Sequence, residues 1–192
     1  MEIRERILRA AVKIYGEVGF RGATTRRIAE EAEVNEVTLF RQFGSKSALL
    51  HEAVHATGLF NYTPQLPEVP VDPRADLLTW SLAHYDDLVA KRPLIRTCLG
   101  ECEEHPEILP PAETTALKSK GTLQAYLSTL QSLGLLRADV DVSVATAMLT
   151  GILFADAMGR DILPDLFQSD DRTSIAAYLD LFLRAVMAPE SP

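Results

Sequence analysis

Residues 24–43 read TTRRIAEEAEVNEVTLFRQF, and their pattern decides the fold of the first part of this chain. Thr24 and Asn35 are residue types that cap helix N-termini, and apolar residues follow each of them at helical spacing. Only a short turn around Glu33 separates the two predicted helices, and the small Ala29 lies where they must cross closely. The stretch therefore predicts a helix-turn-helix whose second helix is short enough to enter a DNA major groove.

Helical patterns continue on both sides of this motif. Apolar residues recur at three- and four-residue steps over residues 3–18, and Gly19 then favours a helix end. Gly44 ends the second helix of the motif, and Ser45 can cap a further helix. We therefore assign residues 1–60 to an N-terminal DNA-binding domain, whose first three helices include the helix-turn-helix.

Prolines occupy every third position in the stretch TPQLPEVPVDP. This spacing matches the polyproline II turn, so residues 61–73 are predicted to form a stiff connector. A docking motif for a proline-binding domain is the alternative.

The remainder of the chain, residues 74–192, has helical rather than alternating patterns. Predicted helices lie near 74–91, 93–105, 110–133, 141–161 and 171–188, with Pro93 at a helix start. The fold class is therefore all-α, with a small N-terminal domain followed by a larger helical domain.

Charge is distributed unevenly along the chain. The net charge of the 192 residues is -8, yet the first 50 residues carry nine Lys or Arg and seven Glu. This segment is therefore slightly basic, and the acidic excess lies entirely in the rest of the chain. Because salt screens charges beyond about 10 Å, a local basic region is sufficient for binding a polyanion.

The sequence also indicates the compartment. Two cysteines cannot form a disulfide framework, and charged residues interrupt the apolar residues at the N-terminus, unlike in a signal peptide. The longest apolar stretch, Ala145 to Gly159, is interrupted by Asp156, so no membrane span is expected. We expect a soluble, cytoplasmic protein.

Three segments together resemble the N-terminal domain of the TetR family of bacterial transcriptional regulators. They are ILRAAVKIYGEVGF, GATTRRIAEEAEV and TLFRQFGSKSALL, which together cover about the first quarter of the chain. The resemblance implies a DNA-binding regulator, most often a repressor, that binds a palindromic double-stranded operator as a homodimer. It also implies a variable helical domain for dimerisation and for a small-molecule effector, which the sequence does not identify.

The resemblance further implies which residues contact DNA. Phosphate contacts fall at the starts of the second and fourth helices, on Thr25, Arg26, Arg27 and Lys46. Base contacts fall on the exposed face of the recognition helix, which comprises Asn35, Glu36, Val37, Thr38 and Arg41. Phe40 is also assigned to the DNA-binding set, at a position where the family often has a tyrosine.

Several positions depart from the family pattern. Glu33 replaces a common turn glycine, and a left-handed backbone there would cost about 1 kcal/mol. Val37 replaces a common glycine and could pack against a thymine methyl, whereas Phe40 replaces a frequent tyrosine and lacks the phenolic hydroxyl. Glu36 is explained by interaction with the helix dipole, or alternatively by acceptance of a hydrogen bond from a cytosine amino group.

In the larger domain, aromatic and polar residues at helical spacing are candidates for an effector pocket, although packing in the core explains each of them as well. The candidates are Phe60, Trp80, His84, Tyr85, Leu88, Arg96, Tyr126 and Phe154.

The last two predicted helices carry small and apolar stripes that could form a four-helix dimer interface, with a monomer core as the alternative. These stripes comprise Ala147, Gly151, Ala155, Ile175, Tyr178, Leu179, Phe182 and Val186.

The sequence contains no catalytic motif, such as a nucleophile elbow or a glycine-rich phosphate loop, so neither an enzyme nor a cofactor is expected. Cys98, Cys102 and His105 share one helical face, and core packing explains them better than thiol sensing or metal binding. No metal site is predicted. The competing hypothesis for the whole chain is a helical small-molecule carrier or enzyme that has lost DNA binding.

Overall fold

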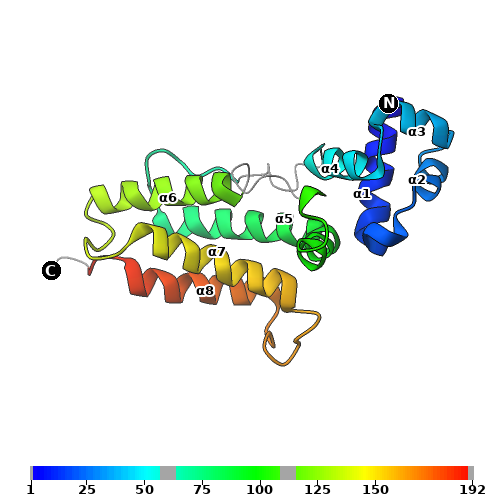
Figure 1. Ribbon diagram of the computed structural model, residues 1–192. Helices are drawn as coiled ribbons and strands as arrows, with labels where there is room; N and C mark the ends of the chain where they lie inside the picture. Colours follow the sequence, from blue (N-terminus) through cyan, green and yellow to red (C-terminus); the bar gives the residue numbers. More distant parts are fainter. Residues whose placement is uncertain (1, 57–63, 109–115, 190–192) are drawn as a thin grey trace. The chain divides into compact units, whose positions relative to one another are not determined.

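Every regular element in the described part of the chain is helical, as the spacing of apolar residues predicted (Figure 1). The structure, a computed structural model, describes residues 2–56, 64–108 and 116–189, and over these ranges it contains eight α-helices and one 3-10 helix. These residues form no strand, only an isolated bridge between Leu136 and Met187.

Helices two to four begin at the predicted caps, and the third ends before Gly44, as predicted. The first four helices are α1 (Ile3–Gly22), α2 (Thr25–Glu31), α3 (Glu36–Phe43) and α4 (Lys46–Ala56). The Thr24 hydroxyl accepts from Arg27 N at 3.2 Å, and Asn35 Oδ1 accepts from Val37 N at 2.8 Å. Ser45 Oγ likewise accepts from Ala48 N at 3.1 Å. Side chains therefore satisfy N–H groups that the first turns would leave unpaired.

Helix α1 does not run straight to its end. Gly19 has φ of 68°, a left-handed conformation that breaks the regular helix, and the chain then turns through Phe20 to Gly22. Residues other than glycine rarely adopt this backbone conformation.

The fifth helix corrects one prediction. Two helices separated at Pro93 were predicted, but α5 (Pro73–Glu101) is continuous through it. Proline removes one intrahelical hydrogen bond, which normally disfavours a helix interior. Here Leu94, Ile95 and Cys98 are buried just after Pro93, and this burial stabilises the continued helix.

The remaining elements are η1 (Pro106–Ile108), α6 (Ala116–Ser132), α7 (Val142–Gly159) and α8 (Asp171–Val186). The side chains of Asp141 and Asp170 cap α7 and α8. Successive helices from α5 to α8 run in opposite directions (Figure 1). Their buried side chains form one core, whose largest members are Trp80, Tyr85, Tyr126 and Phe182.

The chain divides into two compact units that do not follow the order of the sequence. The first unit, hereafter the head, comprises residues 1–62 and 91–116. The second, hereafter the bundle, comprises residues 63–90 and 117–192. The end of α5 thus belongs to the same unit as the helix-turn-helix, which the division at residues 60 and 74 did not anticipate.

Helix α7 is long and apolar enough to cross a membrane by length and composition alone, with a mean hydropathy of 1.5. It is the only such helix in the described residues, and a core helix meets the same criterion. Leu149, Leu153 and Ala157 on its inner face are fully covered by the bundle.

The turn between α2 and α3 contains the predicted backbone irregularity. Glu33 has φ of 53°, and it is the one residue other than glycine with positive φ in the described ranges.

We expect Glu33→Gly to raise the free energy of unfolding by up to about 1 kcal/mol, because glycine relieves the left-handed strain. Urea denaturation measures this. Glu33→Ala is the control and should give no gain, so equal stabilisation by alanine would contradict the assignment.

Candidate nucleic-acid interface

Helix α3 presents two different faces. Leu39 and Phe43 are buried in the head, whereas Val37 and Phe40 are 72% and 46% exposed. Arg41 is also exposed, and Thr38 is half-buried. A short helix with large apolar side chains in solvent is typical of a surface that binds another molecule.

Backbone hydrogen bonds in the turn fix how α3 follows α2. Val34 N donates to Ala29 O at 3.0 Å, and Glu33 N donates to Glu30 O at 3.1 Å. Ala29, whose carbonyl accepts the first of these bonds, is itself buried. This is the arrangement of a helix-turn-helix.

A side-chain bond also joins the starts of the two helices. The Thr25 hydroxyl donates to Glu36 Oε1 in a partly buried position. Sequence reasoning had assigned Thr25 to a phosphate and Glu36 to the helix dipole or a cytosine, and it missed this bond. Nothing in the linear pattern places these two residues together, because they are 11 positions apart on different helices.

The basic side chains assigned to DNA differ in their surroundings. Arg26 Nε donates to Glu30 Oε1 at 3.0 Å, so that its charge is partly neutralised. Arg27 and Arg41 are exposed and form no side-chain hydrogen bond or ion pair within the described residues. These two guanidinium groups are therefore the ones most available to an anion.

Lys46 has an internal partner. Its Nζ donates to Phe20 O at 2.6 Å and lies 3.8 Å from the centre of the Phe20 ring. Burial lowers the pKa of Lys46 below its ordinary value. One of its three N–H groups is thus used inside the head, leaving two that could contact a phosphate.

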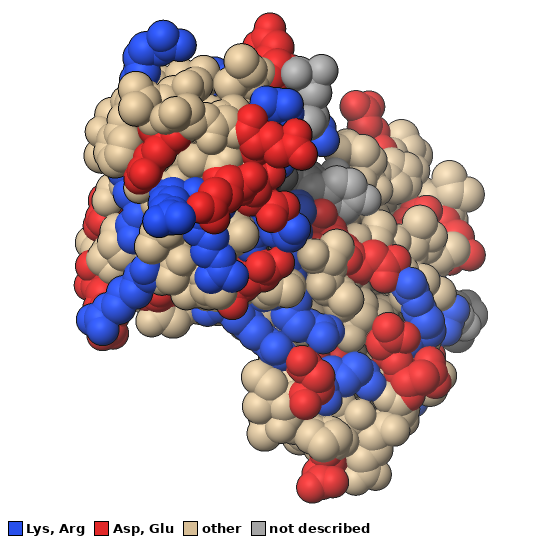
Figure 2. All heavy atoms as spheres, turned by 90° about the vertical axis from the view of Figure 1, so that its right-hand side faces the viewer, with Lys and Arg blue, Asp and Glu red and all other residues tan. Residues whose placement is uncertain are grey.

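Figure 2 shows the side that lies at the right of Figure 1, and on it Lys and Arg lie among Asp and Glu rather than forming one basic patch. Several of the acids that the structure describes in the head form ion pairs, including Glu31 with Lys13 at 2.6 Å. Positive charge on this side is therefore interspersed with negative charge.

Phe20 is held from several directions, a feature that sequence reasoning missed. Its backbone N–H donates to both carboxylate oxygens of Glu101, at 2.8 and 3.0 Å, while its carbonyl accepts from Lys46. The His105 ring lies 3.7 Å from the Phe20 ring, measured between centroids. The end of α5 and the start of α4 thus fix the turn that follows the bend at Gly19.

The two cysteines lie at the end of α5 and just after it. Cys98 is buried, and burial raises its pKa to about 11, so the thiol stays protonated and poorly nucleophilic at neutral pH. Cys102 is half-buried, and its thiol donates to Leu99 O at 3.1 Å. Within the described ranges, no group of three or more His, Cys, Asp or Glu side chains is arranged to hold a metal ion.

The predicted pocket residues do not line one cavity. Trp80, Tyr85 and Tyr126 are buried in the bundle core, while Phe154 is 36% exposed and Arg96 belongs to the head. His84 stacks on Trp80 with ring centroids 4.9 Å apart, and Leu88 packs against the core. Phe60 lies outside the described residues.

One open cavity of about 650 Å³ does lie in the bundle, between α6 and the connector. Tyr126 is the one predicted pocket residue that lines it, beside Gln65, Leu66 and Glu68. The Tyr126 hydroxyl donates to Asp76 Oδ2 at 2.7 Å.

Four of the residues predicted at a dimer interface lie in the core of a single chain. Ile175, Leu179, Phe182 and Val186 are buried within a single chain, because α8 turns this stripe toward the bundle core. They have almost no surface left to offer a partner. The small residues of α7 differ from them, since Ala147, Gly151 and Ala155 are all exposed.

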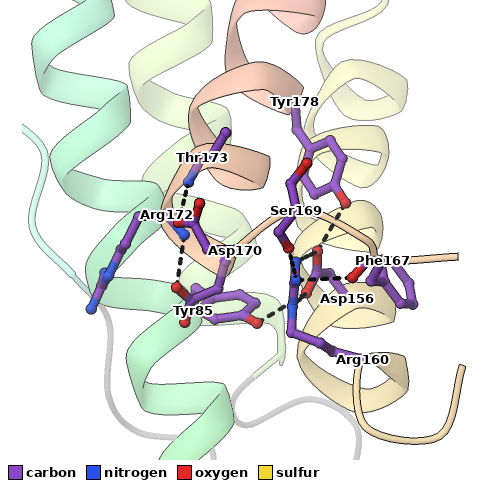
Figure 3. A network of polar contacts seen from close by, with 10 residues as sticks. Tyr85, Asp156, Arg160, Phe167, Ser169, Asp170, Arg172, Thr173 and Tyr178 are labelled. Atoms are coloured by element: carbon purple, nitrogen blue, oxygen red, sulfur yellow. Dashed lines mark hydrogen bonds and ion pairs between the residues drawn. The ribbon is translucent and has the colours of Figure 1, made fainter. Parts of the chain in front are cut away.

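A buried polar network joins α5, α7 and α8 (Figure 3). Asp156 on α7 is fully buried, and its carboxylate accepts from the hydroxyls of Tyr85 and Tyr178 at 2.9 and 2.8 Å. It also binds the Arg160 guanidinium through Nε at 2.8 Å and Nη2 at 2.6 Å. Each carboxylate oxygen of Asp156 therefore accepts two hydrogen bonds, as a buried charge requires.

Arg160 extends the network into the loop before α8. Its Nη1 donates to the carbonyls of Phe167 and Ser169, and its guanidinium lies 5.6 Å from the centre of the Phe167 ring. Asp156 raises the pKa of Arg160 by accepting its hydrogen bonds. The sequence signal was an Asp in an apolar helix with an Arg four positions later. Tyr178, predicted at a dimer interface, instead points its hydroxyl into this network.

Comparison with known proteins agrees with this geometry. Residues 7–53 match the family model described as bacterial regulatory proteins, tetR family. The uncharacterized HTH-type transcriptional regulator YvkB of Bacillus subtilis is 29% identical over 147 residues, covering 73% of this chain and 77% of that protein. The tetracycline repressor protein class C of Escherichia coli is 36% identical over 74 residues, covering 38% of this chain and only 34% of the repressor.

The fold is also similar over nearly the whole chain. The crystal structure of a TetR transcriptional regulator from Agrobacterium tumefaciens matches with a TM-score of 0.71 and 18% identity, covering 97% of this chain and 94% of that one. At this identity the similarity concerns the fold alone. It includes the larger helical unit, whose sequence contains no recognisable motif of its own.

The Asp156 network should be important for stability. We expect Asp156→Leu to lower the free energy of unfolding by about 2–4 kcal/mol, because Arg160 and two tyrosine hydroxyls lose their buried partner. Urea denaturation monitored by circular dichroism measures this. Asp139→Leu removes an exposed acid paired with Arg137 and should have little effect. Equal losses for the two variants would contradict a special role for the network.

Proposed function

Because this chain belongs to the TetR family of bacterial regulatory proteins, we propose that it represses transcription in the cytoplasm by binding a palindromic operator as a homodimer. One observation carries this proposal above all. The short helix α3 is fixed by Leu39 and Phe43, and it turns Val37, Phe40 and Arg41 outward. An eight-residue helix of this kind fits a DNA major groove.

The contacts can be assigned by chemistry. Val37 and Phe40 are apolar and exposed, which suits contact with thymine methyl groups. Arg27 and Arg41 have guanidinium groups without partners among the described residues, and these suit phosphates or guanine. Asn35 uses Oδ1 for its cap and keeps an amide N–H₂ to donate, while Arg26 and Lys46 each keep N–H groups that their internal partners do not use.

For dimerisation we propose the outer face of α7 together with the outer side of α8. Val144, Met148, Ile152 and Ala155 recur at three- and four-residue steps and are exposed, and Leu181 on α8 is 63% exposed. An apolar helical face of this length is unusual on a monomer and typical of an interface. Gly151 lies in its middle and permits close helix approach.

For the effector, we propose a site in the bundle that uses the inner side of α5. The Trp80 indole N–H and the Ser81 hydroxyl are buried and have no hydrogen-bond partner among the described residues. Leaving such groups unpaired costs free energy, so a ligand with acceptor groups could bind there favourably. Effector binding would favour a conformation with lower operator affinity.

Operator binding can be tested with DNA from upstream of the protein's own coding sequence. We expect salt-sensitive, sequence-selective binding, and Arg41→Ala should lower its affinity and reduce the salt slope by about 1. Lys46→Ala should reduce the slope less, because Nζ already has an internal partner. Gel shifts over a series of salt concentrations measure both effects.

Arg74→Ala is the matched control, since it removes an arginine of the bundle that pairs with Asp180 at 2.9 Å. Its salt slope should equal that of the wild type. Absence of any selective DNA binding, with retained small-molecule binding, would instead favour a carrier that has lost its regulatory role.

The dimer face can be tested separately. We expect Met148→Glu to weaken self-association on the order of 100-fold, because it places a charge in the centre of an apolar interface. Sedimentation velocity over a range of concentrations measures this. Val69→Glu introduces the same charge at an exposed apolar residue of the connector and should leave the dimer intact. A Met148→Glu variant that dimerises like the wild type would overturn this choice of face.

A further inference from the structure

The bond between Thr25 and Glu36 lies where the second and third helices begin. Thr25 is the first residue of α2, and Glu36 is the first residue of α3. The Thr25 hydroxyl donates to Glu36 Oε1, and within the described residues Glu36 Oε2 has no hydrogen-bond partner. The carboxylate is therefore held on one side and free to accept on the other.

This bond changes which hydrogen-bonding groups the N-terminal ends of α2 and α3 present to DNA. A hydroxyl has one hydrogen to donate, and Thr25 gives its own to Glu36, so none remains for a phosphate. A carboxylate in the same place repels phosphate. The start of α2 is therefore poorly suited to the phosphate contact that Thr25 would otherwise make.

Interaction with the helix dipole accounts for only part of the observation. An acid anywhere in the first turn of α3 would interact favourably with the dipole. It would not need a partner on another helix, nor a half-buried position beside Val37, which is 72% exposed. The bond fixes the direction of the carboxylate, which the dipole does not require.

The chemistry of base edges then decides what a fixed carboxylate can bind. Only cytosine and adenine present an amino donor in the major groove. On adenine the amino group lies beside the N7 acceptor, which repels a carboxylate, whereas cytosine presents its N4 amino group without an acceptor on the same base. A carboxylate oxygen that can only accept therefore favours cytosine.

We propose that Thr25 orients Glu36 to accept a hydrogen bond from a cytosine N4 amino group in each operator half-site. This inference rests on the proposed function, since it names a base that the DNA-binding surface selects. Glu36 is then a specificity-determining residue, and Thr25 is a positioning residue that acts through it.

The test is selection of bound sequences from a random double-stranded DNA library, using the full-length protein. The wild type should select a palindromic motif with one cytosine that Glu36 controls in each half-site. Glu36→Gln should replace the cytosine preference at that position by adenine, because an amide can both donate and accept. Discrimination for cytosine should fall on the order of five- to tenfold in competition binding, while the other positions persist.

Two further variants distinguish the orientation of Glu36 by Thr25 from a general effect of removing negative charge. Thr25→Val removes the hydroxyl but keeps the shape, and it should weaken the cytosine preference although Glu36 is intact. Glu17→Gln removes one negative charge from an exposed residue of α1, and it should leave the motif unchanged.

The outcomes distinguish the two levels of the proposal. A wild-type protein that selects no motif would contradict the proposed function itself. A wild-type motif retained without change in Glu36→Gln would overturn the cytosine contact. A Thr25→Val motif identical to the wild type, with a changed Glu36→Gln motif, would overturn the positioning role of Thr25.

Discussion

The burial of Leu39 and Phe43 is the constraint on which the DNA-binding surface depends. Helix α3 has eight residues, too few to be stable alone in water. Its two inward side chains fasten it to the head, and the Asn35 cap fixes where it begins. Once these are in place, the directions of all outward residues follow from the helical repeat. The exposure of Val37 is thus a consequence of core packing a few positions away.

Features set by neighbouring residues were predictable from the sequence. The caps at Thr24 and Asn35, the left-handed Glu33 and the end at Gly44 all depend on a few adjacent residues, and the structure contains each of them. The bond from Thr25 to Glu36 was not predictable in this way, because it depends on how two helices cross.

The larger unit shows a different limit of sequence reasoning. The apolar stripe of α8 was correctly recognised, but periodicity does not say whether a stripe faces its own core or a partner. The stripe through Leu179 faces the core, whereas the exposed Leu181 lies outside it. Pro93 was similarly read as a boundary from local preference, yet burial of Leu94 and Ile95 after it outweighs one lost hydrogen bond. Tertiary packing decided both cases.

The paired charges of the head have a consequence for recognition. Arg26 and Lys13 are each bound to a glutamate, so part of the formal basic charge of this segment is offset by ion pairs. Binding that depends on phosphates alone should therefore be weak, because non-specific affinity is set by the number of phosphates neutralised. Contacts with base edges are then expected to supply a larger share of the affinity for DNA. Low attraction to random DNA also raises the ratio of specific to non-specific binding, which matters for any DNA-binding protein because competing sites are many.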